Sequence, residues 1–216
     1  MAAKRATQSK KKAARSASIV KPVYATAAAT KHIWLTFDDG PHSTNTDKVL
    51  ATLAQHGIKA TFFVVGENVK TRKAIVQRAF DAGHRIGNHS YSHPNLTTLT
   101  EAQIRDQIVK TEALISSFLG KDKLFRPPYG AHNARVDKQI SGNGYRSIFW
   151  NVDTEDWNKK YQPTGWITLG VNQIKARSDC RVLNHDIHAT TAANLATFIQ
   201  RIKQLGNVSF MDPSTL

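Results

Sequence analysis

The sequence predicts an α/β protein, a distorted (β/α) barrel of about seven parallel strands in a single domain. Short apolar runs rich in β-forming residues alternate with amphipathic helical segments from Lys31 onward. A chain of 216 residues with 40% hydrophobic composition can bury one substantial core. Polar residues follow several of the expected strands, as they do at the active face of a parallel barrel.

The chain outside its first residues opens with a strand, a helix and a second strand. Residues 33–37 are an apolar run of β-forming residues and predict a buried strand. Residues 47–56 carry apolar side chains at helical spacing and end at Gly57, a typical C-cap. The apolar run at 60–65 predicts the next strand.

The middle of the chain continues the alternation. A helix that ends at Gly83 leads to a weaker strand at 85–88. The clearest helix spans 101–119, with a capping box expected between Thr98 and Glu101 at its start.

The second half repeats the same pattern. A helix before Gly142 and a last helix that ends at Gly206 separate further strands. The start of the strand near Cys180 is polar, so we expect it to be irregular. These later strands are predicted at 124–126, 147–152, 181–183 and 208–211.

Five polar clusters follow five of these strands. They are Asp38-Asp39, His89, the segment 126–129, the segment 153–157 and His185. Because the carboxyl ends of parallel strands open on one face of a barrel, we expect the five clusters to meet in one pocket.

The chemistry of these residues points to a metal site. One carboxylate from Asp38-Asp39 with His89 and His93 makes a three-ligand set suited to zinc, with a fourth position for water or substrate. The other aspartate is then placed to act on that water. Either pattern alone is weak, because two histidines four apart arise by chance and Asp-Asp-Gly is often a turn. Two adjacent carboxylates at the mouth of a buried strand, however, need a cation or other partner.

Five ordered motifs resemble those of the polysaccharide deacetylases, the family 4 carbohydrate esterases with the NodB homology domain. The resemblance covers roughly residues 32 to 212. It implies a distorted barrel of parallel strands, a divalent metal, and removal of acetyl groups from chitin, chitooligosaccharides, peptidoglycan or xylan. The motifs are Thr36-Phe37-Asp38-Asp39-Gly40, His89-Ser90-Tyr91-Ser92-His93, Arg126-Pro127-Pro128-Tyr129, Asp153-Thr154-Glu155-Asp156-Trp157 and Leu183-Asn184-His185.

The resemblance also implies the role of each metal-site residue. Asp39, His89 and His93 would be the metal ligands, and Asp38 the general base. The cation expected is zinc, with cobalt or another transition metal as the alternative.

The remaining roles concern the proton donor and the pocket walls. The resemblance implies that His185 is the general acid, with His188 as the weaker alternative, and that the backbone N–H of Tyr129 contacts the oxyanion. Arg126 would orient Asp38, and Asp156 would orient His185. Trp157 and Leu183 would wall the acetyl methyl group, although core packing is the plain alternative for both, and Tyr129 would be a further substrate-binding residue. The motif assigns Asp153 no clear role, and a structural one is at least as consistent with the sequence.

The basic surplus lies mostly at the start of the chain. Residues 1–31 carry eight Lys or Arg and no acid, within a net charge of +14. We expect this segment to be a solvated, disordered tail or a targeting segment, although it is a poor secretory signal. The domain proper is then 32–216. The single cysteine, Cys180, excludes an internal disulfide and reads as a small buried hydrophobe.

The leading functional hypothesis is an N-deacetylase acting on N-acetylglucosamine-containing polysaccharide or oligosaccharide. An O-acetyl esterase on xylan and a non-catalytic polysaccharide-binding homologue remain open. We expect a monomer with no membrane span and an extracytoplasmic location. A nucleic-acid partner is not expected, because no recognised binding fold accompanies the basic tail.

Overall fold

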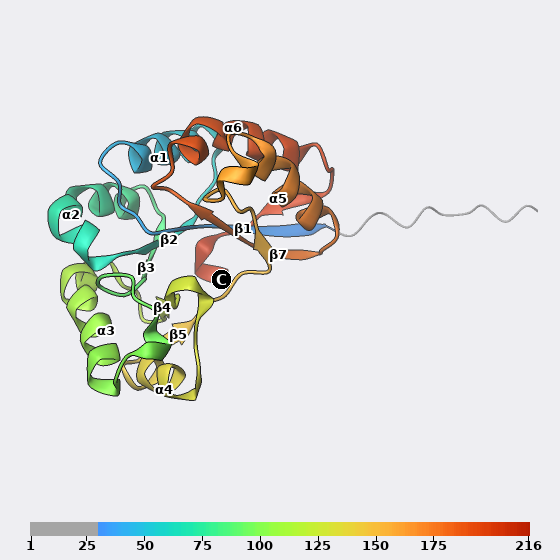
Figure 1. Ribbon diagram of the computed structural model, residues 1–216. Helices are drawn as coiled ribbons and strands as arrows, with labels where there is room; N and C mark the ends of the chain where they lie inside the picture. The colour runs from blue at the N-terminus through green and yellow to red at the C-terminus, as the bar shows by residue number, and fades with distance from the viewer. Residues whose placement is uncertain (1–29) are drawn as a thin grey trace, which may run out of the picture.

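The computed structural model describes residues 30–216. Helices surround a curled sheet of eight described strands (Figure 1). Its strands are β1 (Lys31–Asp38), β2 (Thr61–Val64), β3 (Arg85–Asn88), β4 (Lys123–Phe125), β5 (Tyr145–Ser147), β6 (Val152–Asp153), β7 (Asp179–His185) and β8 (Val208–Phe210). Its α-helices are α1 (Asn45–His56), α2 (Gly66–Asp81), α3 (Glu101–Ile115), α4 (Ala134–Gly142), α5 (Gly165–Lys175) and α6 (Ala189–Lys203).

The strands are all parallel, and the predicted barrel of about seven strands is confirmed. Their order is β5-β4-β3-β2-β1-β7-β6, with β8 pairing the first residues of β1. β1 pairs with β7 along nearly its whole length, from His32 beside Asp179 to Asp38 beside His185. The expected irregular start of β7 is therefore wrong.

The predicted strand at 147–152 is wrong in one respect, because the structure divides it in two. β5 pairs with β4 at one edge of the sheet, and β6 pairs with β7 at the other. Two carbonyl groups between these strands accept hydrogen bonds from arginine side chains. Arg126 Nε donates to Ile148 O and Arg181 Nε donates to Phe149 O, each at 3.1 Å. The segment between β5 and β6 thus crosses the open side of the half-barrel without a ladder of its own.

Two helix predictions need correction. The capping box of α3 uses Thr100 and Gln103 rather than Thr98 and Glu101, because Gln103 Oε1 accepts from Thr100 N at 2.9 Å. The helix α5 was not predicted from the sequence.

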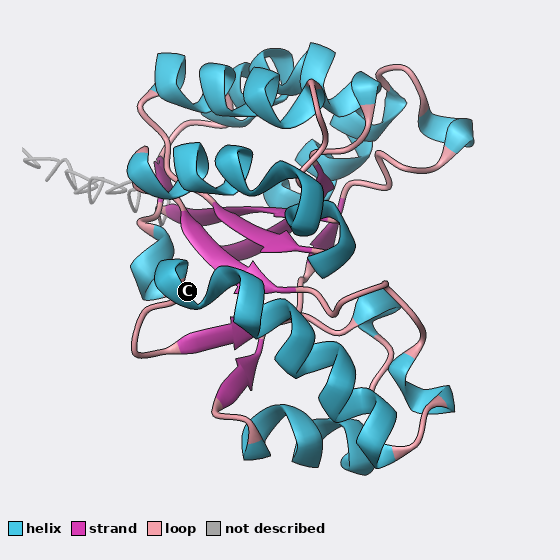
Figure 2. Cartoon of the chain, turned by 90° about the vertical axis from the view of Figure 1, so that its left-hand side faces the viewer, coloured by secondary structure: helices cyan, strands magenta, loops and turns pink. Residues whose placement is uncertain are grey.

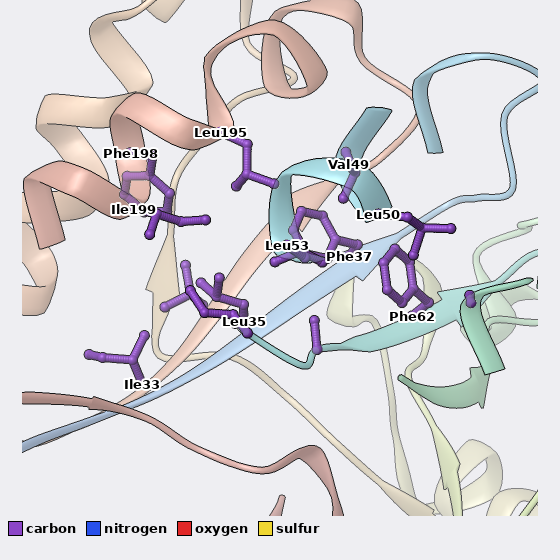
Figure 3. Close-up of a cluster of buried hydrophobic side chains, with 14 of the residues drawn as sticks. Ile33, Leu35, Phe37, Val49, Leu50, Leu53, Phe62, Leu195, Phe198 and Ile199 are labelled. Atoms are coloured by element: carbon purple, nitrogen blue, oxygen red, sulfur yellow. The ribbon is translucent and has the colours of Figure 1, made fainter. Parts of the chain in front are cut away.

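The main core lies between β1 and the helices α1 and α6. Side chains alternate along a strand, so Ile33, Leu35 and Phe37 of β1 all point to the same face. Figure 3 shows them meeting apolar side chains of α1 and α6. The opposite face of β1 carries Thr36 and Asp38, which turn toward the inside of the half-barrel. Figure 2 shows the helices packed around the sheet.

The basic tail predicted at 1–31 lies outside the described residues except for its last two. Lys31 is already the first residue of β1, and its Nζ donates to Arg177 O at 2.6 Å. Within residues 30–216, no helix is both long and apolar enough to cross a membrane.

Candidate active site

The predicted site residues gather at the carboxyl ends of the strands. Asp38 and His185 are the last residues of β1 and β7, and His89 and Arg126 directly follow β3 and β4. Every predicted site residue except Arg126 and Asp156 lines one cavity of about 440 Å³. Those two are fully buried behind the cavity wall.

Asp39, His89 and His93 form a cluster with the geometry of a metal site. Their ligand atoms all lie within 4.8 Å of one another. Asp39 Oδ1 is 3.4 Å from His89 Nε2 and 3.2 Å from His93 Nε2. This carboxylate oxygen is buried, yet none of the described groups gives it a hydrogen bond of good geometry. A cation would satisfy it, and a carboxylate with two imidazoles suits zinc.

Unusual backbone conformations bring two of these residues into the cluster. Asp39 has φ of 74° and His93 has φ of 57°, a left-handed region that few residues other than glycine adopt. Neighbouring side chains on a strand point to opposite faces, so the turn at Asp39 is what lets it share a pocket with Asp38. Such conformations persist only where surrounding contacts impose them, and they concentrate at functional sites.

The loop that carries the two histidines is held by a neighbouring helix. Gln107 of α3 accepts hydrogen bonds from Tyr91 N at 2.8 Å and Ser92 N at 2.9 Å. Ser90 Oγ accepts from His93 N at 3.1 Å. The ligand loop is therefore tied to the scaffold through its own backbone.

The ring orientation of His89 is fixed from behind. Its Nδ1 lies 2.6 Å from the carbonyl oxygen of Arg126, which makes Nδ1 the protonated nitrogen. The other nitrogen, Nε2, then carries a lone pair that faces Asp39 and the cluster.

Neighbouring histidines favour the carboxylate form of Asp39, and burial favours the neutral form of His93. Burial would raise the pKa of Asp39, but the close approach and charge of His89, with His185 and His93, lower it below its usual value. Burial, followed by the charge of His89, lowers the pKa of His93. A carboxylate and a neutral imidazole are the forms that bind a metal.

Asp38 is held by a buried guanidinium. Arg126 Nη1 donates to Asp38 Oδ1 at 2.8 Å and to Thr36 Oγ1 at the same distance. The second oxygen, Asp38 Oδ2, is 3.7 Å from His89 Nε2. One oxygen of Asp38 is thus anchored, and the other faces the cluster.

His185 is paired with a buried carboxylate, that of Asp156. Asp156 Oδ1 is 2.7 Å from His185 Nδ1, and Asp156 Oδ2 accepts from His185 N at 2.8 Å and Thr191 Oγ1 at 2.6 Å. Burial lowers the pKa of His185, but the hydrogen bond and charge of Asp156 outweigh it and raise the pKa to about 9. His188 lies beside it, with ring centres 5.6 Å apart.

Aromatic and aliphatic side chains complete the cavity. Tyr129 has φ of 60° and stands 68% exposed, with its ring 4.6 Å from that of His93. Trp157 is half exposed, whereas Leu183 of β7 is buried at the cavity wall.

Trp150 lines the cavity, although the sequence predicts it only as part of a strand. Asp153 belongs to one of the clusters expected to meet in one pocket, without an assigned role, and it lines the cavity as well. Trp150 reaches the cavity because Arg126 and Arg181 bind the carbonyl groups of Ile148 and Phe149 and interrupt the strand. These are tertiary contacts, so the local sequence carries no signal for them.

Comparisons with known proteins agree with these motifs. The family model described as polysaccharide deacetylase matches residues 25–148. The peptidoglycan-N-acetylglucosamine deacetylase PgdA of Listeria monocytogenes is 43% identical over 190 residues, which are 88% of this chain and 40% of that protein. A chitin deacetylase of a Pestalotiopsis species is 37% identical over 161 residues, which are 73% of this chain and 54% of that protein.

A solved structure extends the likeness to the fold. The family 4 carbohydrate esterase from Streptomyces lividans, in complex with acetate, superposes with a TM-score of 0.74 at 33% identity. The match covers 85% of this chain and 93% of that one. The chain spans only 40% and 54% of the two curated relatives' length. Since the family match covers more than half of its residues, the chain belongs to the polysaccharide deacetylases, the family 4 carbohydrate esterases.

Proposed function

We propose that the chain is a metal-dependent N-deacetylase, which hydrolyses the acetamido group of N-acetylglucosamine residues in a polysaccharide or oligosaccharide and releases acetate. One observation carries this proposal: Asp39, His89 and His93 cluster in the cavity that Asp38 and His185 also line, and each of these last two is paired with a fully buried charged side chain. The pairs are Asp38 with Arg126 and His185 with Asp156.

Asp39, His89 and His93 are the proposed metal ligands. A divalent ion held there would lower the pKa of a water and polarise the acetyl carbonyl. Zinc suits this donor set best, and cobalt or another transition metal is the alternative.

Asp38 is the proposed general base. Its anchored oxygen bonds to Arg126, so its second oxygen is directed at the place where the attacking water must lose a proton. Arg126 orients this carboxylate without touching the substrate.

Tyr129 is the proposed source of the oxyanion contact. Its left-handed backbone sits at the cavity edge, where its N–H is available to the oxygen that gains charge as the carbonyl is attacked. Trp157 and Leu183 supply the apolar wall proposed to surround the acetyl methyl group.

His185 is the proposed general acid. An amide nitrogen must be protonated as its bond to carbon breaks, because an amide anion is a very poor leaving group. The raised pKa of His185 keeps the imidazole protonated at neutral pH, so the proton is in place when the amine departs.

The test is acetate release from three substrates: chitooligosaccharides, peptidoglycan fragments and acetylated xylan. The proposal expects release from N-acetylated glycans, loss after chelation and recovery with zinc or cobalt, with mass spectrometry locating the new amine. Release from xylan alone would make the chain an O-acetyl esterase. Glycan binding without release, insensitive to chelator, would make it a non-catalytic homologue.

An extracytoplasmic location follows from the proposed substrates. The relatives reported above are named for peptidoglycan and chitin, polymers that cells build outside their membrane. The expected monomer and the expected lack of a nucleic-acid partner stay predictions.

A further inference from the structure

Asp153 is an acidic residue of the cavity with no place in the proposed chemistry. It ends β6 and lines the same cavity as His185 and Trp157. The carboxylate that pairs with His185 is that of Asp156, and the cluster of possible metal ligands does not include Asp153. Among the described residues, no cationic side chain lies within ion-pair distance of it.

The backbone of Asp153 is rigidly placed. Gln173 of α5 clamps it from both sides: Gln173 Oε1 accepts from Asp153 N at 3.1 Å, and Gln173 Nε2 donates to Asp153 O at 2.6 Å. A residue held in this way presents its side chain without a large loss of freedom on binding.

The two carboxylate oxygens of Asp153 differ. Oδ1 accepts the backbone N–H of Glu155 at 2.9 Å, in the turn that a side chain makes with the residue two positions on. Oδ2 accepts no hydrogen bond from the residues described in the structure. One oxygen therefore fixes the side chain, and the second remains as an acceptor at a half-buried place.

The surroundings of this acceptor suit a sugar. Trp150 and Trp157 line the cavity with it, and indole rings pack well against the apolar faces of pyranose rings. A 1,4-linked N-acetylglucosamine inside a chain has two hydroxyl donors, at C3 and C6. Burial raises the pKa of Asp153, because it removes water molecules that would hydrogen-bond to the carboxylate. A sugar hydroxyl that donates to this carboxylate would replace one of those hydrogen bonds.

We propose that Asp153 is a sugar-binding residue: its second carboxylate oxygen accepts a hydrogen bond from a hydroxyl of the sugar that carries the acetamido group. This inference rests on the proposed deacetylase function. It assigns Asp153 to holding the sugar ring, apart from the residues that break the amide bond.

The test is a thermodynamic cycle that combines a substitution of Asp153 with removal of one sugar hydroxyl. The kcat and KM for acetate release are measured with triacetylchitotriose and with its 3-deoxy and 6-deoxy analogues. Asp153→Asn retains an acceptor for Glu155 N–H and puts an amide nitrogen in place of the second oxygen. It should lower kcat/KM on the parent trisaccharide by about 10- to 100-fold, the range for a hydrogen bond to a charged group.

The analogue that lacks the contacted hydroxyl gives the decisive comparison. With it, the wild-type kcat/KM should already be lowered, and Asp153→Asn should lower it no further, because the two changes remove one interaction. An equal loss on all three substrates would overturn the proposal and leave Asp153 with a structural role.

Controls separate this proposal from the function on which it rests. Wild-type protein that releases no acetate from the trisaccharide contradicts the deacetylase function before any variant is made. Asp81→Asn, the same change at an exposed position of α2, should match wild type on every substrate. If Asp153→Asn fails to fold, Asp153→Ser serves instead, since a serine hydroxyl can also accept the N–H two residues on.

Discussion

Arg126 and Asp38 form a buried ion pair at the carboxyl ends of β4 and β1. Nη1 of the arginine lies 2.8 Å from Oδ1 of the aspartate, and the two residues are 0% and 3% exposed. The guanidinium also donates to Thr36 Oγ1 and Ile148 O, and its Cζ lies 4.2 Å from the ring centre of Phe63. The pair thus links the base of the proposed mechanism to the segment that crosses the open side of the sheet.

Removing the arginine should destabilise the fold strongly. Arg126→Met roughly keeps the side-chain volume but leaves the buried Asp38 without its cationic partner, and breaking a buried pair costs about 3–5 kcal/mol. Urea unfolding measures the loss. Adding Asp38→Asn should restore part of it, because the buried charge is then gone.

The matched control is Arg78→Met. Arg78 Nη2 is 2.7 Å from Asp47 Oδ2, a similar ion pair on the exposed surface, so the urea midpoint should hardly move. Equal effects of the two methionine variants would show that burial of the Arg126 pair has no energetic consequence.

Variants of Asp38 and His89 should separate catalysis from metal binding. Asp38→Asn should retain the metal and lower kcat by about 10²-fold or more, since it removes the general base. His89→Ala should lose bound metal and activity together, measured by elemental analysis after dialysis. His132→Ala is the control, because His132 pairs with Asp137 on the surface.

The opposite result would reverse the assignment of the two aspartates. If Asp38→Asn lost the metal and kept its rate, Asp38 would be the ligand and Asp39 the base.

The pH dependence should depend on Asp156. The protonated form of His185 is the active acid, so activity is present below its pKa and falls as pH rises through it. Asp156 raises that pKa to about 9, and Asp156→Asn removes the charge that does so. The alkaline limb of kcat/KM should therefore move to lower pH, by about 1 to 3 units.

A pH series on both proteins checks this shift, with Asp137→Asn as a surface control that leaves the limb in place. A uniform loss of rate with an unmoved alkaline limb would contradict the role given to His185.

Sequence patterns located the strand ends well and the local backbone less well. Asp38, His89 and His185 could be placed together because parallel strands end on one face, which periodicity alone predicts. The left-handed turns at Asp39 and His93 could not be predicted, because residue type does not require them and only contacts with distant segments impose them.

The same reason explains the elements that were missed. The run 147–152 has strand composition, but Arg126 and Arg181 bind its carbonyl groups and divide it. Trp150 consequently lines the cavity. The capping box of α3 lies two residues after the predicted one, because Gln103 rather than Glu101 bonds back to the backbone of the capping threonine, Thr100. Each of these outcomes depends on a side-chain contact that propensity does not encode.

The close contact behind the turn at Asp39 gives the last prediction. Gly40 directly follows Asp39, and a Cβ at Gly40 would overlap the carboxylate of Asp186, with Cγ only 2.7 Å away. Asp186 cannot easily withdraw, because it is fully buried and accepts a hydrogen bond from Thr46 Oγ1. Gly40→Ala should therefore displace the turn that carries Asp39, lower the free energy of unfolding by about 1–3 kcal/mol and weaken zinc retention. Gly120→Ala is the control, since no heavy atom lies within 4 Å of its added Cβ. If both alanine variants bound zinc and unfolded alike, Asp186 would not be what fixes the position of Asp39.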